Sequence, residues 1–441
     1  MLLLTVFGIF IACMVLSLIL DISMLVPLAI GFVLFSLLAR KCGFTWRQIL
    51  LFAKDSCKDS FIVIGILLII GCLTGMWRQS GTVAYFVTLG VSLIPPQLFI
   101  LAAFLLSAAM SFAIGTSFGV TATAGVILMS IARAGGADPV WSAAAILSGV
   151  YVGDRGSPAA SSANLVSVLT HTDMRRNVRE MLRSSILPFF LCCAIYAAKS
   201  LLAPMHDMDT AVLRLLEGEF RLQWYCLIPA VLMIVLPFCN LSVKLSMAVS
   251  LLSSVCVGIF LQGSSPADCL RAMVVGFTPK DEVLTEMLSG GGLVSMLEVC
   301  GILLISGTYG GLFSKTGILD GVRETLRSFA ARIGRYPVMV ILGTALSAVF
   351  CNQTIAVIMQ NQLSGSLYGD QEEERYAKML DMENSVILLA GIVPWCIASS
   401  VPLGMLGAGA GSIPFAFYLW LIPLFRLIRS AADRKHQGGR I

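Results

Sequence analysis

Residues 65–81 read GILLIIGCLTGMWRQSG, and residues 301–317 read GILLISGTYGGLFSKTG. Matching isoleucines and leucines carry little weight, because apolar strings match easily by chance. Glycines at identical offsets carry more, and four pairs coincide: Gly65/Gly301, Gly71/Gly307, Gly75/Gly311 and Gly81/Gly317. Further along each copy, LLSAAMS (residues 105–111) corresponds to ALSAVFC (residues 345–351). The sequence therefore predicts an internal duplication.

The composition indicates that this duplication lies in a membrane. Hydrophobic residues make up 57% of the 441-residue chain and charged residues only 12%, whereas a soluble domain carries about 25% charge. The mean hydropathy is +0.89. Apolar stretches of spanning length, about 20 residues, recur at 2–20, 22–38, 61–76, 98–114, 186–202, 224–241, 245–261, 293–312, 338–350 and 413–428. We predict an all-α polytopic membrane protein with about a dozen segments, because backbone amides in lipid must be hydrogen-bonded internally.

Basic residues predict that the two copies have opposite orientations. Lys and Arg collect at the cytoplasmic ends of membrane segments. Five of them lie between residues 40 and 58, before the first copy, and four lie between residues 175 and 183, after it. The connection at 82–97 is uncharged, whereas the equivalent connection of the second copy, residues 315–335, carries five basic residues. These charges also predict that both termini are cytoplasmic.

The chain is therefore expected to contain two inverted-topology repeats with discontinuous helices or re-entrant hairpins. The expected parts are an N-terminal hairpin with a basic loop (1–58), repeat 1 (59–170), a connecting region with three transmembrane helices (171–291), repeat 2 (292–410), and a final helix with a basic tail (411–441). Inverted repeats are a construction of secondary transporters, whose binding site lies near the midplane. The alternative is a duplicated helix bundle with no transport role.

Small and polar residues interrupt the apolar pattern within each copy. In the first copy the stretch GVYVGDRGSPAASSANL (residues 149–165) contains Gly153, Gly156 and Pro158, which disfavour a continuous helix. In the second copy GIVPWCIASS (residues 391–400) contains Pro394. Broken helices expose carbonyls and amides that can replace the hydration shell of a small cation. Close helix–helix packing is the alternative explanation for small residues.

Asp154 is the first candidate for an ion ligand, because a carboxylate is costly to keep within a membrane. Desolvation favours the protonated carboxyl group, and a cation then competes with the proton for the same oxygens. Glu383 is a second candidate carboxylate, although it could also cap a helix. Arg155 either neutralises Asp154 in an ion pair or binds an anion. Neutral oxygen ligands suited to a hard cation are offered by Ser157, Ser161, Ser162, Asn164, Asn352 and Gln353.

The stretch at 149–165 resembles the GxYxGD[KR]xSP…NL element of the NhaC-type sodium/proton antiporters of the ion transporter superfamily. The resemblance covers nearly the whole chain, including SGGGLVSMLE (289–298), GGLFSKTG (310–317), CNQ (351–353), IVPWCIASSVPLG (392–404) and PFAFYLWLIPL (414–424). It implies exchange of sodium for protons in a prokaryotic cytoplasmic membrane.

The sequence departs from this family at three positions. Family members often carry an acidic residue where Ser161, Asn352 and Asn384 stand here. These differences leave the ion and the stoichiometry open. A relative in the same group exchanges organic acids, so the alternative substrate is a small organic anion, malate-like, lactate-like or an amino acid.

Enzymatic chemistry is not expected from this chain. The histidines and cysteines offer no nucleophile–base pair and no metal-ligand spacing, so we expect no cofactor and no metal beyond transported Na⁺. The basic C-terminal tail is typical of a cytoplasmic end and does not indicate nucleic-acid binding. The expected partners are Na⁺, H⁺ and the lipid bilayer, with a homodimer as a further option.

Overall fold

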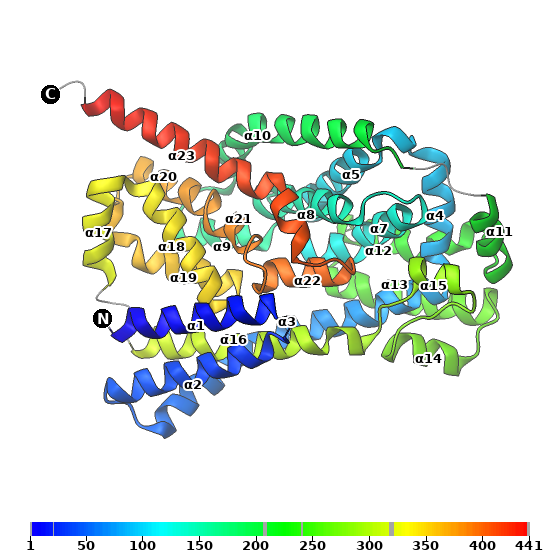
Figure 1. The fold of residues 1–441 in the computed structure, drawn as a ribbon, viewed down its shortest axis with the longest axis horizontal. Helices are drawn as coiled ribbons and strands as arrows, with labels where there is room; N and C mark the ends of the chain where they lie inside the picture. Colours follow the sequence, from blue (N-terminus) through cyan, green and yellow to red (C-terminus); the bar gives the residue numbers. More distant parts are fainter. Residues whose placement is uncertain (1, 21, 206–209, 240, 317–321, 439–441) are drawn as a thin grey trace.

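A computed structural model describes residues 2–20, 22–205, 210–239, 241–316 and 322–438 (Figure 1). Within these ranges the secondary structure is helical, apart from one isolated β-bridge between Phe277 and Gly290. The all-α prediction is confirmed.

The first part of the chain forms the following elements: α1 (Leu2–Ile19), α2 (Leu25–Lys41), α3 (Trp46–Gln79), α4 (Thr82–Leu93), η1 (Pro96–Leu98), α5 (Phe99–Ile114), α6 (Ser117–Val120), η2 (Thr121–Gly125), α7 (Val126–Ala134), α8 (Pro139–Gly156), α9 (Ser161–Thr170), α10 (Met174–Leu202) and α11 (Thr210–Glu219). The connecting region continues with η3 (Trp224–Leu227), α12 (Ile228–Phe238), α13 (Val243–Cys256), η4 (Val257–Leu261), α14 (Pro266–Val274) and α15 (Glu282–Leu288).

The last part forms η5 (Leu293–Met296), α16 (Leu297–Thr316), α17 (Val322–Ile333), α18 (Arg335–Phe350), α19 (Gln353–Leu363), η6 (Gly365–Leu367), α20 (Glu372–Glu383), α21 (Val386–Ala390), α22 (Ile397–Met405), η7 (Ala410–Phe415) and α23 (Phe417–Gly438).

Two helical hairpins have tips of the same construction. In the first, α5 ends at a left-handed Gly115, and an extended Thr116 then caps α6 by accepting from the Gly119 amide at 3.3 Å. In the second, α18 ends at a left-handed Cys351, and an extended Asn352 caps α19. The Asn352 side chain accepts from the amides of the second and third residues after it, at 2.9 and 3.3 Å. Side-chain caps replace the backbone bonds that each reversal removes.

Contacts at the bases show that the chain doubles back in both hairpins. The Met205 amide donates to the Pro96 carbonyl just before α5, at 3.1 Å, and a Cβ added to Gly135 just after α7 would lie 2.2 Å from the Met205 sulfur. In the second hairpin, Gln360 of α19 donates to the Met339 carbonyl of α18 at 2.7 Å. Residues 99–134 are called hairpin 1 below, and residues 335–363 hairpin 2.

The first long helices of the two predicted copies, α3 and α16, pack side by side in opposite directions (Figure 1). Lys315 near the end of α16 lies 2.9 Å from Asp55 early in α3. Ser60 donates to the Leu303 carbonyl at 3.3 Å, in the middle of both helices. Opposite directions are what inverted copies require, and the inversion itself stays a prediction.

Three of the repeated glycines, Gly71, Gly75 and Gly311, lie where backbones approach closely. On α3, a Cβ at Gly71 would lie 2.7 Å from the Gly292 carbonyl oxygen. A Cβ at Gly75 would lie 2.1 Å from the Ala272 carbonyl oxygen. On α16, a Cβ at Gly311 would lie 2.2 Å from the Phe52 carbonyl oxygen. These positions must be small, because any side chain would separate the packed backbones.

Five helices of the described chain are long and apolar enough to cross a membrane, or seven if each of two bent pairs counts as one span. The bent pairs join residues 46–58 to 63–79, at 47°, and residues 372–392 to 397–405, at 51°. Three shorter apolar helices lie at Thr5–Ile19, Trp224–Pro237 and Arg335–Phe350. The expected count of about a dozen included such shorter segments and stays a prediction.

Candidate functional site

Asp154 lies near the end of α8, with 5% of its surface exposed, and faces the tips of both hairpins. Ser117, two residues past the tip of hairpin 1, donates to its Oδ1 at 3.3 Å. Gln353, two residues past the tip of hairpin 2, donates from Nε2 to its Oδ2 at 3.4 Å. Each carboxylate oxygen is thus approached by one hairpin. Both hydrogen bonds are longer than usual.

Helix α8 ends at Gly156, two residues after Asp154, and the chain resumes as α9 at Ser161. The predicted interruption is therefore present, and Pro158 lies within it. Ser162 of α9 reaches back and donates to the Asp154 carbonyl. Asn164 donates to the carbonyls of Pro158 and Ala160, at 3.0 and 2.7 Å. The break thus holds its shape through hydrogen bonds from the first turn of α9.

A second break, at residues 391–396, separates α21 from α22 and contains Pro394. The Trp395 indole donates to the Ala348 carbonyl at 2.8 Å, and the Ile397 amide donates to the Cys351 carbonyl at 2.9 Å. Both acceptors belong to the end of α18. These bonds attach the second break to the tip of hairpin 2.

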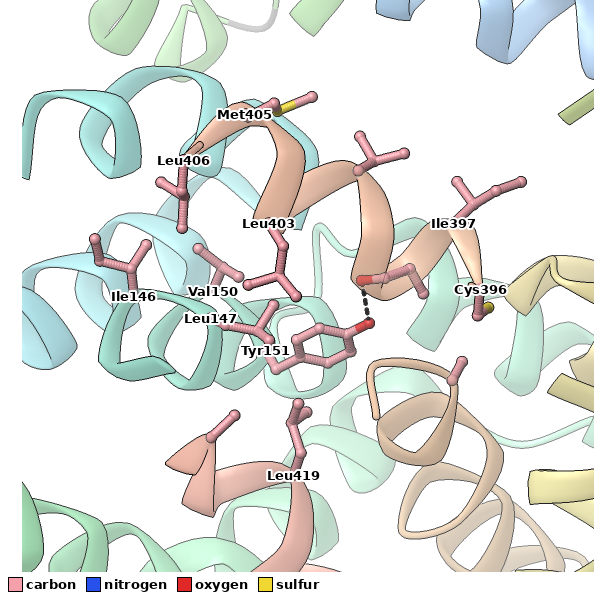
Figure 2. Packing of buried hydrophobic residues seen from close by; sticks show 14 of the residues in the cluster. Ile146, Leu147, Val150, Tyr151, Cys396, Ile397, Leu403, Met405, Leu406 and Leu419 are labelled. Carbon is pink, nitrogen blue, oxygen red and sulfur yellow. Dashed lines mark hydrogen bonds between the residues drawn. The ribbon is translucent and has the colours of Figure 1, made fainter. Parts of the chain in front are cut away.

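Tyr151 connects α8 to the helix that follows the second break. Its hydroxyl donates to the Ala398 carbonyl of α22 at 2.8 Å, within a layer of buried aliphatic side chains that includes Val150, Leu403 and Leu406 (Figure 2). A Cβ on Gly391 would lie 2.6 Å from the Tyr151 ring, so the break must approach this ring closely. Asp154 and the two breaks therefore belong to one packed unit.

Arg155 is fully buried and points away from Asp154. Its Nη1 donates to the Met181 carbonyl at 3.2 Å, and its Nη2 donates to the Ser184 hydroxyl at 2.7 Å and to the Asn384 side-chain oxygen at 2.5 Å. An ion pair with Asp154 was one of two predicted roles for Arg155, and these two side chains do not form it, because neighbouring residues on a helix face different directions. Arg155 instead connects α8 to α10 and to the end of α20.

Glu383 occupies the last position of α20, with 1% of its surface exposed. Its Oε2 is buried and has no hydrogen-bond partner in the described structure. The side-chain oxygen of the next residue, Asn384, accepts a hydrogen bond from Arg155. The backbone carbonyl of Asn384 accepts a second hydrogen bond, from the Tyr336 hydroxyl, at 2.7 Å. Glu383 thus ends a helix and does not cap a helix N-terminus.

The remaining residues of the predicted site have other positions and contacts. Gly153 lies inside α8 and does not break it, and a Cβ on Gly153 would lie 1.9 Å from the Ser111 carbonyl carbon of α5. Gly156 is the last residue of α8, directly before the break. Ser157 accepts from the Ala159 amide within its own turn at 3.1 Å. Ser161 is exposed, and Asn352 caps α19. Of the predicted neutral ligands, Ser162 and Gln353 bond directly to Asp154.

The sequence prediction did not select three residues of this site: Ser117, Ser184 and Asn384. Ser117 belongs to a stretch of small and polar residues at 115–123, and close helix–helix packing explains such a stretch equally well. Ser184 and Asn384 are neutral residues that gain a role only because a buried arginine reaches them.

The sequence is similar to a family of transporters and to several known proteins. Residues 149–430 match the model of the "Na+/H+ antiporter family". A malate-2H(+)/Na(+)-lactate antiporter of Bacillus subtilis is 28% identical, over 94% of this chain and 90% of its own length. The Na(+)/H(+) antiporter NhaC of Alkalihalophilus pseudofirmus is 24% identical, over 91% of this chain and 89% of its own length. The arginine/ornithine antiporter ArcD of Halobacterium salinarum is 25% identical, over 91% of this chain and 85% of its own length.

The matched region includes both helix breaks, Asp154, hairpin 2 and Glu383. With its long apolar helices, the chain is a multi-pass membrane protein. Since the family model covers well over half of the sequence, this protein belongs to the Na⁺/H⁺ antiporter family.

Proposed function

We propose that this chain exchanges Na⁺ for H⁺ by alternating access, and that Asp154 is the carboxylate at which the two ions compete. The observation that carries the proposal is the meeting of both hairpin tips at one buried carboxylate, through Ser117 and Gln353. Each tip contributes a neutral donor whose hydrogen bond favours the ionised carboxylate, and a small hard cation binds carboxylate oxygens in that form.

Charge balance supports exchange at this site. Buried Arg155 carries a permanent positive charge, while Asp154 and Glu383 each carry a negative charge when ionised. With both acids ionised the cluster has one net negative charge, which either one Na⁺ or one proton neutralises. Because net charge is costly inside a membrane, the cluster would carry one ion or the other, but not both at once.

The antiparallel packing of α3 and α16 supports the inverted arrangement that alternating access requires. We place the protein in the cytoplasmic membrane of a prokaryote, with both termini in the cytoplasm. Basic residues at the start of α10 and at the end of α23 support this orientation.

A second candidate is exchange of a small organic anion, and the similarity to the malate–lactate antiporter favours it. The predicted anion ligand for that function is Arg155. In this structure its Nη atoms donate to three protein oxygens, and binding an anion would require breaking those bonds. The geometry therefore favours cation exchange.

The test uses purified protein in vesicles that contain a pH-sensitive dye. Adding Na⁺ outside should drive protons out of the wild-type vesicles, and Li⁺ and K⁺ added separately report selectivity. Asp154→Asn should abolish the response, whereas Asp370→Asn, in an exposed loop, should not change it. Full activity of Asp154→Asn would refute the proposal. Uptake of labelled malate or arginine without a sodium-dependent proton flux would support the second candidate instead.

A further inference from the structure

A cavity of about 330 Å³ lies between α10, α20 and α23. Ser184 and Asn384 line it, and both side chains accept hydrogen bonds from the Arg155 guanidinium. The cavity therefore ends against the two residues that hold Arg155 in place. It is separate from the Asp154 carboxylate, whose hydrogen-bond donors belong to the two hairpins.

Three arginines line this cavity: Arg183, Arg426 and Arg429. Asp381 balances Arg426, accepting from its Nε and Nη2 at 2.9 and 2.8 Å. Arg183 lies 3.3 Å from Glu180, but 67% of the Arg183 side chain is exposed, and such surface pairs are weak. Arg429 is exposed, and the described part of the chain provides no ion pair for it. Two positive charges are therefore available to a ligand.

The cavity lies at the border between polar and apolar sequence on both of its long helices. On α10, Arg183 is the last basic residue before the uncharged stretch 184–198. On α23, Arg426 is the first charged residue after the uncharged stretch 417–425. Basic residues at such a border lie at the depth of lipid headgroups. The other walls are apolar, and Leu187 and Phe425 are among them.

We propose that this cavity binds an anionic phospholipid, with its phosphate between Arg183 and Arg429 and the start of its acyl chains against Leu187 and Phe425. Guanidinium groups bind phosphate through charge-assisted hydrogen bonds. Basic pockets between membrane helices are suited to anionic headgroups. A free phosphate ion would meet the same arginines but would gain nothing from the apolar wall. The bound lipid fixes α10 against α23, beside the Ser184–Arg155–Asn384 contact.

The experiment compares phosphatidylglycerol with phosphatidylcholine of the same acyl chains, added to the delipidated full-length protein in detergent. Native mass spectrometry measures the fraction of protein with bound lipid, and thermal unfolding measures Tm. Phosphatidylglycerol should bind at least about tenfold more tightly than phosphatidylcholine and raise Tm by about 3 °C. The Arg183→Gln/Arg429→Gln double variant should lose both effects. Arg179→Gln, an exposed change on the same helix outside the cavity, should retain them.

Both substituted arginines are exposed, so the double variant should unfold at the wild-type Tm when no lipid is present. Arg429→Gln alone, which breaks no contact seen in the structure, provides a second test and should lose part of the effect. Equal binding of the two lipids would overturn the proposal, as would an equal loss in Arg179→Gln. The same Tm increase from inorganic phosphate alone would assign the site to a free anion and would also overturn it.

Discussion

Gln353 donates from Nε2 to Asp154 at 3.4 Å across 199 positions of sequence, and donates from the same atom to the Ile387 carbonyl at 2.9 Å. One amide group therefore connects the tip of hairpin 2, the carboxylate on α8, and α21 beside the second break. This amide favours the ionised form of the carboxylate, which is the form that a cation binds. We therefore propose that the tip of hairpin 2 supports cation binding at Asp154.

This relationship predicts a specific loss when Gln353 is replaced by leucine. A hydrogen bond of normal length to an ionised group contributes about 1.5–3 kcal/mol. Because this bond is long at 3.4 Å, Gln353→Leu should raise the sodium concentration for half-maximal exchange severalfold, up to about tenfold. Proton-flux measurements in vesicles over a range of sodium concentrations provide the value. Gln362→Leu, an exposed position on the same helix, should leave it unchanged. An unaltered sodium dependence in Gln353→Leu would separate hairpin 2 from the ion site.

Glu383 provides a second prediction. If Glu383 is ionised, its negative charge is part of the net charge of the Asp154, Arg155 and Glu383 cluster. Glu383→Gln then leaves one negative charge on Asp154 and one positive charge on Arg155, which cancel without a bound cation. Sodium should then bind about tenfold more weakly, equivalent to about 1.4 kcal/mol. Isotopic sodium binding to purified protein measures this directly, with the exposed Glu324→Gln on α17 as control. Wild-type sodium affinity in Glu383→Gln would mean that Glu383 stays protonated and is only structural.

The contact between α5 and α8 predicts opposite outcomes for two neighbouring glycines. A Cβ on Gly153 would lie 1.9 Å from a backbone carbon of α5, whereas the nearest atom to a Cβ on Gly156 is 4.0 Å away. Overpacking costs about 1–3 kcal/mol and sometimes more, so Gly153→Ala should lower both Tm and expression. Gly156→Ala should leave both near wild type. Thermal unfolding in detergent compares them, and equal Tm values would contradict the close packing described here.

The sequence was sufficient to predict the helical class and both helix breaks. Pro158 and Pro394 lie in the breaks, and Asp154 lies in the last turn of the helix before the first one. Proline acts on its own backbone and on the preceding turn, so its effect is visible locally. A carboxylate in an apolar setting is likewise conspicuous without any knowledge of its partners.

The sequence was not sufficient where a role depends on a distant partner. Gly153 was predicted to break a helix, but it serves the contact with Ser111 of α5. Glycine fits either role, and only the packed structure distinguishes them. Asn164 was predicted as an ion ligand, but its amide stabilises carbonyls four and six residues earlier. Ser184 could not be selected because the orientation of Arg155 was unknown.

The opposite orientation of the two copies can be tested without a transport assay. Helices α4 and α17 follow the first long helix of their respective copies, and we predict that α4 lies outside the cytoplasm and α17 inside. Alkaline phosphatase folds only after export because its disulfides need an oxidising compartment. Its fusion after Ile94 should therefore be active and its fusion after Ile333 inactive, while a fluorescent protein should show the reverse. Equal enzyme activity of the two fusions would mean that the two copies have the same orientation in the membrane. The two hairpins would then enter from the same side and could not expose Asp154 to each side of the membrane in turn.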